Sequence, residues 1–283
     1  MGRASAGWPA PAKLNLFLHV TGRRDDGYHL LQTVFQFLDF CDELIFDVRR
    51  DTSIRRISDC PGLPADSDLV VRAARALQAH TGTGLGVDIH VSKHIPMQAG
   101  LGGGSSDAAT TLRALNRLWG LELPVGELAA IGVKLGADVP VFLHGHAAFA
   151  EGVGEELTDL EPAEEWYLII HPDCSVSTAE IFNDADLTRH TPPITIRDFL
   201  TGAGHNDCEA VVFRAFPEVA EAARWLGQFA EVRMTGTGAC LFARFADKGA
   251  AETIMEQLPE KWSGFVARGL NDSPLKKRLR AET

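Results

Sequence analysis

Apolar and polar positions alternate along the first part of the chain and predict its strands. In residues 11–20, PAKLNLFLHV, one set of alternate positions holds Leu14, Leu16, Leu18 and Val20. The positions between them hold Lys13, Asn15, Phe17 and His19. This pattern predicts a half-buried strand that presents polar groups on its second face. Shorter strands are predicted over 44–48 and 87–91, and a turn-rich loop over 22–29.

Between these strands the apolar residues take a helical spacing. Residues 66–82 predict a helix that an Asp or a Ser caps at its start and a glycine ends. Leu112, Leu115, Leu118 and Trp119 share one face of a second helix, which Gly120 ends. A further helix is predicted over 127–136 and a strand over 146–152.

The second half of the chain mixes helices and strands. Strands are predicted over 166–172, 232–235, 240–245 and 264–270, and helical segments over 206–229 and 248–257. This mixed order favours an α+β fold with two lobes over a doubly wound sheet. We place a soft boundary near residue 150, which gives an N-terminal lobe over 1–150 and a C-terminal lobe over 151–283. The sequence leaves open whether the residues after about 265 pack back on the first lobe.

The composition is that of an ordinary globular protein, with 45% hydrophobic and 23% charged residues in 283. The five cysteines are far apart and form no C-x-x-C pair, which argues against a zinc site and a disulfide framework. They are Cys41, Cys60, Cys174, Cys208 and Cys240. The start of the chain lacks the apolar stretch of a secretory signal, and no apolar run approaches the ~18 residues of a membrane span. We therefore expect a cytoplasmic protein with free thiols and no membrane partner.

The formal net charge is −11, which argues against nucleic acid as a partner because nucleic-acid binders present a basic face. The basic run from Lys276 to Arg280 is interpreted as a solvated end of the chain. Any anionic ligand must be held by local donors against an unfavourable overall field.

A glycine-rich loop, PMQAGLGGGSSDAA (96–109), carries the strongest chemical signal. No G-K-[ST] occurs in the chain, so the loop is not a Walker A motif, and it does not match the dinucleotide fingerprint. Glycines can turn their N–H groups inward, and the N-terminus of a following helix attracts anions. These features favour a phosphate over the alternative, a flexible turn in which Ser105 caps the helix.

Three further positions each allow two interpretations. The glycine pair in TGTGAC (235–240) is a hairpin turn when taken alone, but two glycine loops suggest two backbones approaching one ligand. Asp138, in GADVPVF, is either a general base for a hydroxyl or a helix or turn cap. Lys13 either pairs with a carboxylate or is exposed.

Taken together, these segments resemble the GHMP kinase superfamily. The match rests on PAKLNLFL (11–18), IPMQAGLGGGSSDAA (95–109) and RMTGTGAC (233–240), in this order. Within the superfamily, DGYHLLQT (26–33), GADVPVFL (136–143) and NDCE (206–209) resemble the members that act on a cytidine-diphosphate-linked methylerythritol. The resemblance covers nearly the whole chain. It implies a two-lobed fold with the active site in the cleft, and ATP-dependent phosphorylation of an alcohol in non-mevalonate isoprenoid biosynthesis.

The resemblance also implies residue roles. Lys13 and Asp138 match the catalytic pair, in which Asp138 would accept the hydroxyl proton. Tyr28 and His29 match residues that contact the cytosine, and Phe182 would stack on it. The positions that match ATP-binding residues are Asp68, Lys93, Pro96, Met97, Gln98, Ala99, Gly100, Leu101, Gly102, Gly103, Gly104, Ser105 and Ser106. The substrate-binding set comprises Asn15, Tyr28, His29, Phe182, Gly236 and Gly238. Relatives often have Asn-Leu where this chain has Asp68-Leu69, which leaves the adenine-side contact open.

The implied cofactor is ATP with Mg²⁺ that the nucleotide carries, because the sequence shows no carboxylate cluster for a dedicated metal cage. Ser105 or Ser106 would touch this ion. The sequence leaves the choice between a monomer and a homodimer open. Three alternatives stand beside this hypothesis: a kinase for another alcohol, such as mevalonate, homoserine or a sugar; a catalytically silent nucleotide-binding regulator; and a globular protein whose glycines only form turns. The DGYH segment argues against the first, and the presence of both Lys13 and Asp138 against the second.

Overall fold

A computed structural model describes residues 7–59 and 63–281 of the chain. Cys60 and the first six residues, on which part of the cysteine and leader predictions rest, lie outside the described residues. The strands are β1 (Trp8–Arg23), β2 (His29–Arg49), β3 (Ile54–Arg56), β4 (Gly86–Ser92), β5 (Ala148–Glu151), β6 (Glu156–Asp159), β7 (Trp166–His171), β8 (Val232–Met234), β9 (Leu241–Phe245) and β10 (Ser263–Leu270). The helices are α1 (Leu69–Thr81), α2 (Gly103–Leu118), α3 (Val125–Gly132), α4 (Val139–His144), α5 (Thr178–Asn183), α6 (Ile196–Leu200), α7 (Glu209–Ala215), α8 (Pro217–Leu226), α9 (Lys248–Met255) and α10 (Pro274–Ala281), with a 3-10 turn, η1 (Ala65–Ser67).

One ten-stranded sheet runs through both lobes in the order β3-β4-β2-β10-β7-β9-β8. β1 pairs antiparallel with β2, and β5 and β6 extend from the same strand. β10 joins the lobes, since it pairs with β2 on one side and with β7 on the other. The α+β class with two lobes is thus confirmed, and none of the described helices is long and apolar enough to cross a membrane.

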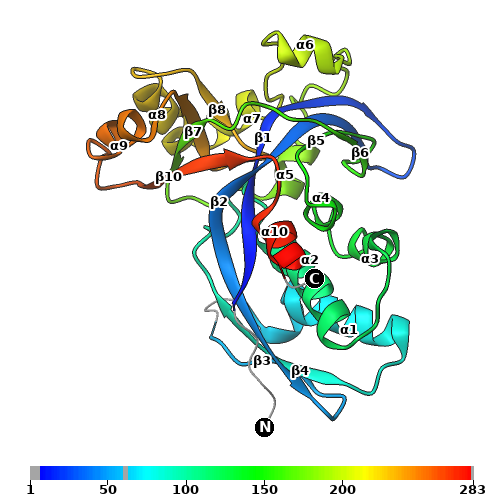
Figure 1. The fold of residues 1–283 in the computed structure, drawn as a ribbon. Coiled ribbons are helices and arrows are strands. Elements are labelled where there is room, and N and C mark those ends of the chain that lie inside the picture. The colour runs from blue at the N-terminus through cyan, green and yellow to red at the C-terminus, as the bar shows by residue number, and fades with distance from the viewer. Residues whose placement is uncertain (1–6, 60–62, 282–283) are drawn as a thin grey trace.

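The first lobe packs α1, α2, α3, α4 and α10 beside the long β1–β2 pair (Figure 1). Local sequence signals set the ends of α1. The Asp68 side chain accepts a hydrogen bond from the backbone N–H of Val70, and Gly82 ends the helix in the left-handed conformation. The second lobe buries the apolar residues of α7, α8 and α9 against β7, β8 and β9.

The prediction that β1 is half-buried is wrong, because both of its faces are covered. Lys13, Asn15 and His19 are only 2%, 4% and 3% exposed. The backbone N–H of Lys13 donates to Leu101 O of the glycine loop at 3.0 Å, and that of Asn15 donates to Thr235 Oγ1 at 2.9 Å. Segments about 90 and 220 residues further along the chain therefore cover the polar face.

Other elements differ from the predictions in extent. β2 is continuous over 21 residues, of which only 44–48 were predicted. The helical segment over 206–229 is divided into α7 and α8 at Phe216, because Pro217 has no N–H to continue the first helix. The helix predicted over 127–136 ends at Gly132, and α4 follows as a separate helix.

The interpretation of the basic run 276–280 as a solvated end is only partly right, because Lys277 and Arg280 are exposed but the run belongs to a packed helix. It lies in α10, which packs beside β1 in the first lobe (Figure 1). Leu275 is 2% exposed, and the Arg278 guanidinium lies 4.6 Å from the centroid of the Trp8 ring. An amphipathic helix with basic residues in its last turn explains both the charge run and the packing.

Candidate active site

A cavity of about 860 Å³ lies where β1, the glycine loop, the 235–240 turn and the start of α5 meet. Most of the residues singled out in the sequence line it. They are Lys13, Asn15, Asp68, Lys93, Pro96, Met97, Gln98, Ala99, Gly100, Gly102, Gly103, Gly104, Ser105, Asp138, Phe182, Gly236 and Gly238. The structure thus brings together positions that are more than 200 residues apart in the chain.

Four of the predicted residues do not line this cavity. Leu101 and Ser106 are buried behind the loop, and the Ser106 hydroxyl has no hydrogen-bond partner among the described residues. Tyr28 is 63% exposed at the tip of the β1–β2 connection. His29 does not line the cavity itself, but its ring stacks on Phe182, which does, with ring centroids 5.0 Å apart.

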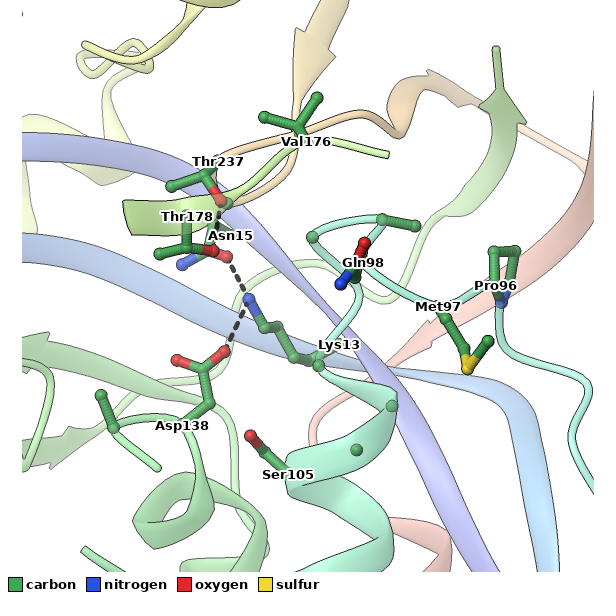
Figure 2. A pocket seen from close by; sticks show the side chains of 18 of the residues that line it. Lys13, Asn15, Pro96, Met97, Gln98, Ser105, Asp138, Val176, Thr178 and Thr237 are labelled. Atoms are coloured by element: carbon green, nitrogen blue, oxygen red, sulfur yellow. Dashed lines mark hydrogen bonds and ion pairs between the residues drawn. The ribbon is translucent and has the colours of Figure 1, made fainter. Parts of the chain in front are cut away.

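Lys13 and Asp138 form an ion pair at the centre of the cavity, with Nζ 3.2 Å from Oδ2 (Figure 2). Lys13 also donates a hydrogen bond to Asn15 Oδ1. The alternative that Lys13 is exposed is wrong, because it is 2% exposed. Asp138 occupies the N-cap position of α4, but its side chain makes no capping hydrogen bond, so the cap alternative is wrong as well. Its carboxylate is 35% exposed and accessible from the cavity.

The glycine loop ends in the first turn of α2. Gly102 is the N-cap residue with φ of 72°, and α2 begins at Gly103, so Ser105 lies inside the helix and does not cap it. The first intrahelical bond runs from Ser106 N–H to Gly102 O. The N–H groups of the three preceding residues therefore have no intrahelical acceptor and lie at the positive end of the helix dipole. This geometry is suited to an anion such as a phosphate.

The second glycine loop packs directly against the first. The hydroxyl of Thr235 donates to Gly100 O at 3.1 Å, and the N–H of Cys240 donates to Ala99 O at 3.1 Å. A Cβ atom added to Gly100 would lie 2.1 Å from Thr235 O, so this approach requires a glycine. The 235–240 segment does connect two antiparallel strands, β8 and β9, as the hairpin interpretation predicts. The turn and the first loop also line one cavity, so the prediction that both approach one ligand stays open.

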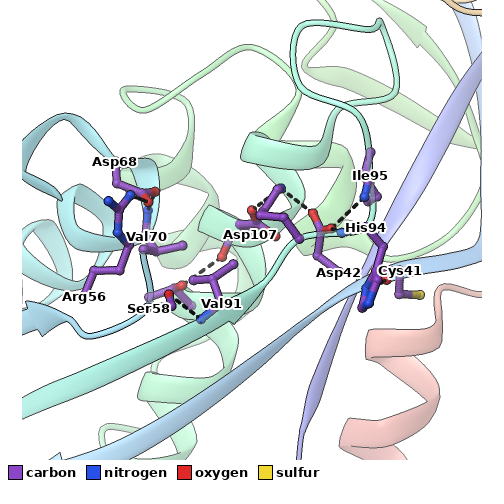
Figure 3. A network of polar contacts seen from close by, with 12 residues as sticks. Cys41, Asp42, Arg56, Ser58, Asp68, Val70, Val91, His94, Ile95 and Asp107 are labelled. Carbon is purple, nitrogen blue, oxygen red and sulfur yellow. Dashed lines mark hydrogen bonds and ion pairs between the residues drawn. The ribbon is translucent and has the colours of Figure 1, made fainter. Parts of the chain in front are cut away.

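A buried network of charges supports the side of the cavity around Lys93 (Figure 3). Lys93 Nζ bonds to Asp42 and lies 2.7 Å from Asp107 Oδ2. Asp42 Oδ1 accepts from the backbone N–H groups of His94 and Ile95, at 2.6 and 2.8 Å. Burial raises the pKa of Asp107 to about 7 against the opposing charge of Lys93, and the two carboxylates outweigh burial to raise the pKa of Lys93. The network fixes the strand end from which the glycine loop departs.

At the same end of the cavity, Asp68 accepts a hydrogen bond from Arg56 Nη1 at 2.5 Å. A charged partner thus holds the Asp68 carboxylate in place. Sequence reasoning missed Arg56, Asp42 and Asp107. For Asp42, a carboxylate within an apolar strand is a usable signal, because such a group must find a partner when it is buried.

Threonines that the sequence did not single out also line the cavity. Thr178 Oγ1 and Thr237 Oγ1 share a hydrogen bond of 2.9 Å between the start of α5 and the second glycine loop (Figure 2). Thr33 accepts a hydrogen bond from Asn15 Nδ2 at 2.9 Å and so fixes the amide next to Lys13. Single hydroxyls of this kind leave no pattern in the sequence. Within the described part of the chain, no group of three His, Cys, Asp or Glu side chains is arranged to hold a metal ion.

Comparison with known families and proteins gives concordant matches. The profile of the GHMP kinases N terminal domain matches residues 68–146, and that of the GHMP kinases C terminal matches residues 187–264. A 4-diphosphocytidyl-2-C-methyl-D-erythritol kinase of Pseudomonas savastanoi pv. phaseolicola is 57% identical over 99% of this chain and 97% of that protein. The enzyme of the same name from Cupriavidus metallidurans is 56% identical over 94% of each chain.

Solved structures agree with these matches. A crystal structure of 4-(cytidine 5'-diphospho)-2C-methyl-D-erythritol kinase superposes with a TM-score of 0.81 at 32% identity, over 93% of this chain and 99% of that chain. A mevalonate kinase superposes with a TM-score of 0.71 at 16% identity, over 95% of this chain and 100% of that chain. This second likeness concerns the fold alone.

Proposed function

This chain belongs to the GHMP kinase family, and we propose that it transfers the γ-phosphoryl group of ATP to the 2-hydroxyl of 4-diphosphocytidyl-2-C-methyl-D-erythritol. This reaction is a step of non-mevalonate isoprenoid precursor biosynthesis. Full-length relatives that carry the name of this kinase support the substrate. The observation that carries the chemistry is the Lys13–Asp138 pair, which faces the cavity beside the phosphate-suited glycine loop.

Asp138 acts as the general base in this proposal. Its partly exposed carboxylate takes the proton of the 2-hydroxyl as the oxygen forms a bond to the γ-phosphorus, and the bond from that phosphorus to the β–γ bridging oxygen breaks. Lys13 stabilises the negative charge that gathers between hydroxyl and phosphate. The unpaired N–H groups at the start of α2 stabilise charge on the β- and γ-phosphates.

Mg²⁺ fits the oxygen donors that line the cavity, and it would arrive with ATP. Of the two serines that the sequence offered, Ser105 belongs to the cavity wall, and its hydroxyl is the group that would touch the ion. When bound, the ion neutralises charge on the phosphates. The predicted roles of Asp68 beside the adenine, of Lys93 at the nucleotide site, and of Tyr28, His29 and Phe182 at the cytosine belong to the same proposal. So does the cytoplasmic location, which rests on the sequence alone.

The test measures ADP release with ATP, Mg²⁺ and the cytidine substrate, with a control that lacks the substrate. We expect substrate-dependent release and a phosphate on the sugar alcohol. Asp138→Asn should lower turnover by about 10²- to 10⁴-fold while ATP still binds. Asp247→Asn is the matched control, because Asp247 caps α9 outside the cavity and Asn retains the cap. Equal turnover of Asp138→Asn and the native protein would remove Asp138 as the base.

Two alternatives give different results in the same assay. Phosphorylation of mevalonate, homoserine or a sugar in place of the cytidine substrate would identify a kinase for another alcohol. Binding of ATP and the cytidine substrate without ADP release would identify a silent regulator.

A further inference from the structure

Arg189 joins the ring of His29, on β2, to the backbone of Phe182, on α5, beside the cavity. Its Nε donates to His29 Nε2 at 3.1 Å, and its Nη2 donates to the carbonyl oxygens of Phe182 and Asp184 at 3.0 and 2.6 Å. A further hydrogen bond joins its Nη1 to Leu187 O at 3.1 Å. One guanidinium therefore holds the imidazole, the residue on which the imidazole stacks, and the turn after α5.

These contacts determine where the proton on His29 lies. A guanidinium nitrogen carries only donors, so His29 Nε2 must present its lone pair to Arg189. The imidazole is then neutral and carries its hydrogen on Nδ1. Burial, Arg189 and Arg23 all lower the pKa of His29, which agrees with a neutral ring. Arg189 and Arg23 are the charged groups that act on this ring in the described part of the chain.

The Nδ1–H group has no hydrogen-bond partner among the described residues, and it is not fully buried although His29 as a whole is only 9% exposed. The ring lies against Phe182, with an interplanar angle of 24°, and Phe182 lines the cavity. A pyrimidine base presents acceptors at its ring nitrogen and its carbonyl oxygen. A hydrogen-bond donor in this place therefore matches the pyrimidine base of the substrate that the proposed function requires.

We propose that Arg189 is a positioning residue that locks His29 as the neutral Nδ1–H tautomer and thereby makes it a donor to the pyrimidine of the substrate. The identity of that ligand rests on the proposed function, whereas the tautomer does not.

The first test reads the tautomer of His29 without any ligand. Two-dimensional ¹H–¹⁵N NMR of the histidine rings, with His29→Gln to assign the signals, should show Nδ1–H in the native protein between pH 6 and 8. In Arg189→Met the ring should change to Nε2–H, the form that a free imidazole prefers. A native ring that carries its proton on Nε2, or that is charged at pH 7, would overturn the proposal even if the kinase reaction proved different.

The second test measures the KM for the cytidine substrate and for ATP. Arg189→Met should raise the KM for the cytidine substrate roughly 5- to 50-fold at pH 8 and leave that for ATP unchanged. The defect should shrink at pH 5.5, where an imidazolium regains an Nδ1–H donor. A merely structural role would give a defect that does not depend on pH, and that result, or an unchanged KM, would overturn the proposal.

Arg214→Met is the matched control. Arg214 supports the same turn through the side chains of Asp184 and Asp186 but does not touch His29 or Phe182. It should leave the KM for the cytidine substrate unchanged, and a defect equal to that of Arg189→Met would assign the effect to the turn. Arg189→Lys keeps a charged donor and should recover part of the affinity. If Arg189→Met does not fold, the KM of Arg189→Lys for the cytidine substrate is measured in its place.

Discussion

The contact between the two glycine loops leads to a prediction about Gly100→Ala. Gly100 has a φ of 77°, and an added Cβ would lie 2.1 Å from Thr235 O and 3.1 Å from Gly238 O. Real Cβ atoms do not approach a backbone oxygen this closely, so one loop must move. Because the second loop is also bonded to Asn15 of β1 and to Asn206, its movement would disturb the cavity wall.

The loss of unfolding free energy in Gly100→Ala has two parts. An alanine in the left-handed region costs about 1–2 kcal/mol. The overlap with the backbone of the second loop adds about 1–3 kcal/mol, as overpacking does elsewhere. Gly100→Ala should therefore lose about 2–5 kcal/mol of unfolding free energy, and the KM for ATP should rise because the phosphate loop is displaced.

Gly120→Ala separates these two parts. Gly120 has a φ of 66°, but nothing lies within 4 Å of the Cβ position. Its cost is therefore only the backbone term of about 1–2 kcal/mol, and its kinetics should stay normal. Urea denaturation gives the two free energies, and steady-state kinetics with varied ATP gives the KM. Equal stability losses together with a normal KM in Gly100→Ala would refute the close contact between the loops.

Three further predictions concern the surroundings of the cavity. Asp107 binds its proton more tightly in the folded protein, so its contribution to stability is present at low pH and is lost as the pH rises toward about 7. Asp107→Asn should therefore reduce the fall in unfolding free energy between pH 5 and 8 by at least about 1 kcal/mol in urea titrations. An unchanged pH dependence would contradict this. Leu275→Ala should cost about 2–5 kcal/mol, against at most about 0.5 kcal/mol for the exposed Leu200→Ala, and equal losses in thermal unfolding would show that α10 does not pack on the first lobe. Asn206→Ala removes the donor to Met234 O and Gly236 O and should cost about 2–4 kcal/mol in the same unfolding assay, so a loss below about 1 kcal/mol would exclude Asn206 as a support of the second loop.

Elements with local signals were predictable from the sequence. The structure gives α1 the expected cap and glycine end, and β4 and β9 follow their predicted ranges closely. In each case the deciding interaction lies within a few residues of the element. The helical face of α2 and its end at Trp119 follow the same rule.

Long-range contacts explain where the predictions from the sequence were wrong. The polar face of β1 follows the alternation of a half-exposed strand, yet the second glycine loop and the 205–207 segment cover it. In β2, Asp39 and Asp42 interrupt the apolar alternation, and only the pairing with β1 and β10 shows that the strand continues. The sequence suggested that Lys13 could pair with a carboxylate, but Asp138 lies 125 positions away. The resemblance to a known family supplied that pairing, which no local rule could provide.

The different solvent exposures of Lys13 and Asp138 suit these two residues to different tasks. Lys13 is 2% exposed and held by both Asn15 and Asp138, so its ammonium is fixed before any ligand arrives. A buried ammonium is costly unless it is paired, and the pair would be broken if Asp138 were lost. Asp138 itself is 35% exposed, which leaves its carboxylate accessible from the cavity. In the proposed reaction, a fixed cation beside an accessible carboxylate would stabilise the anion that develops as the proton is transferred.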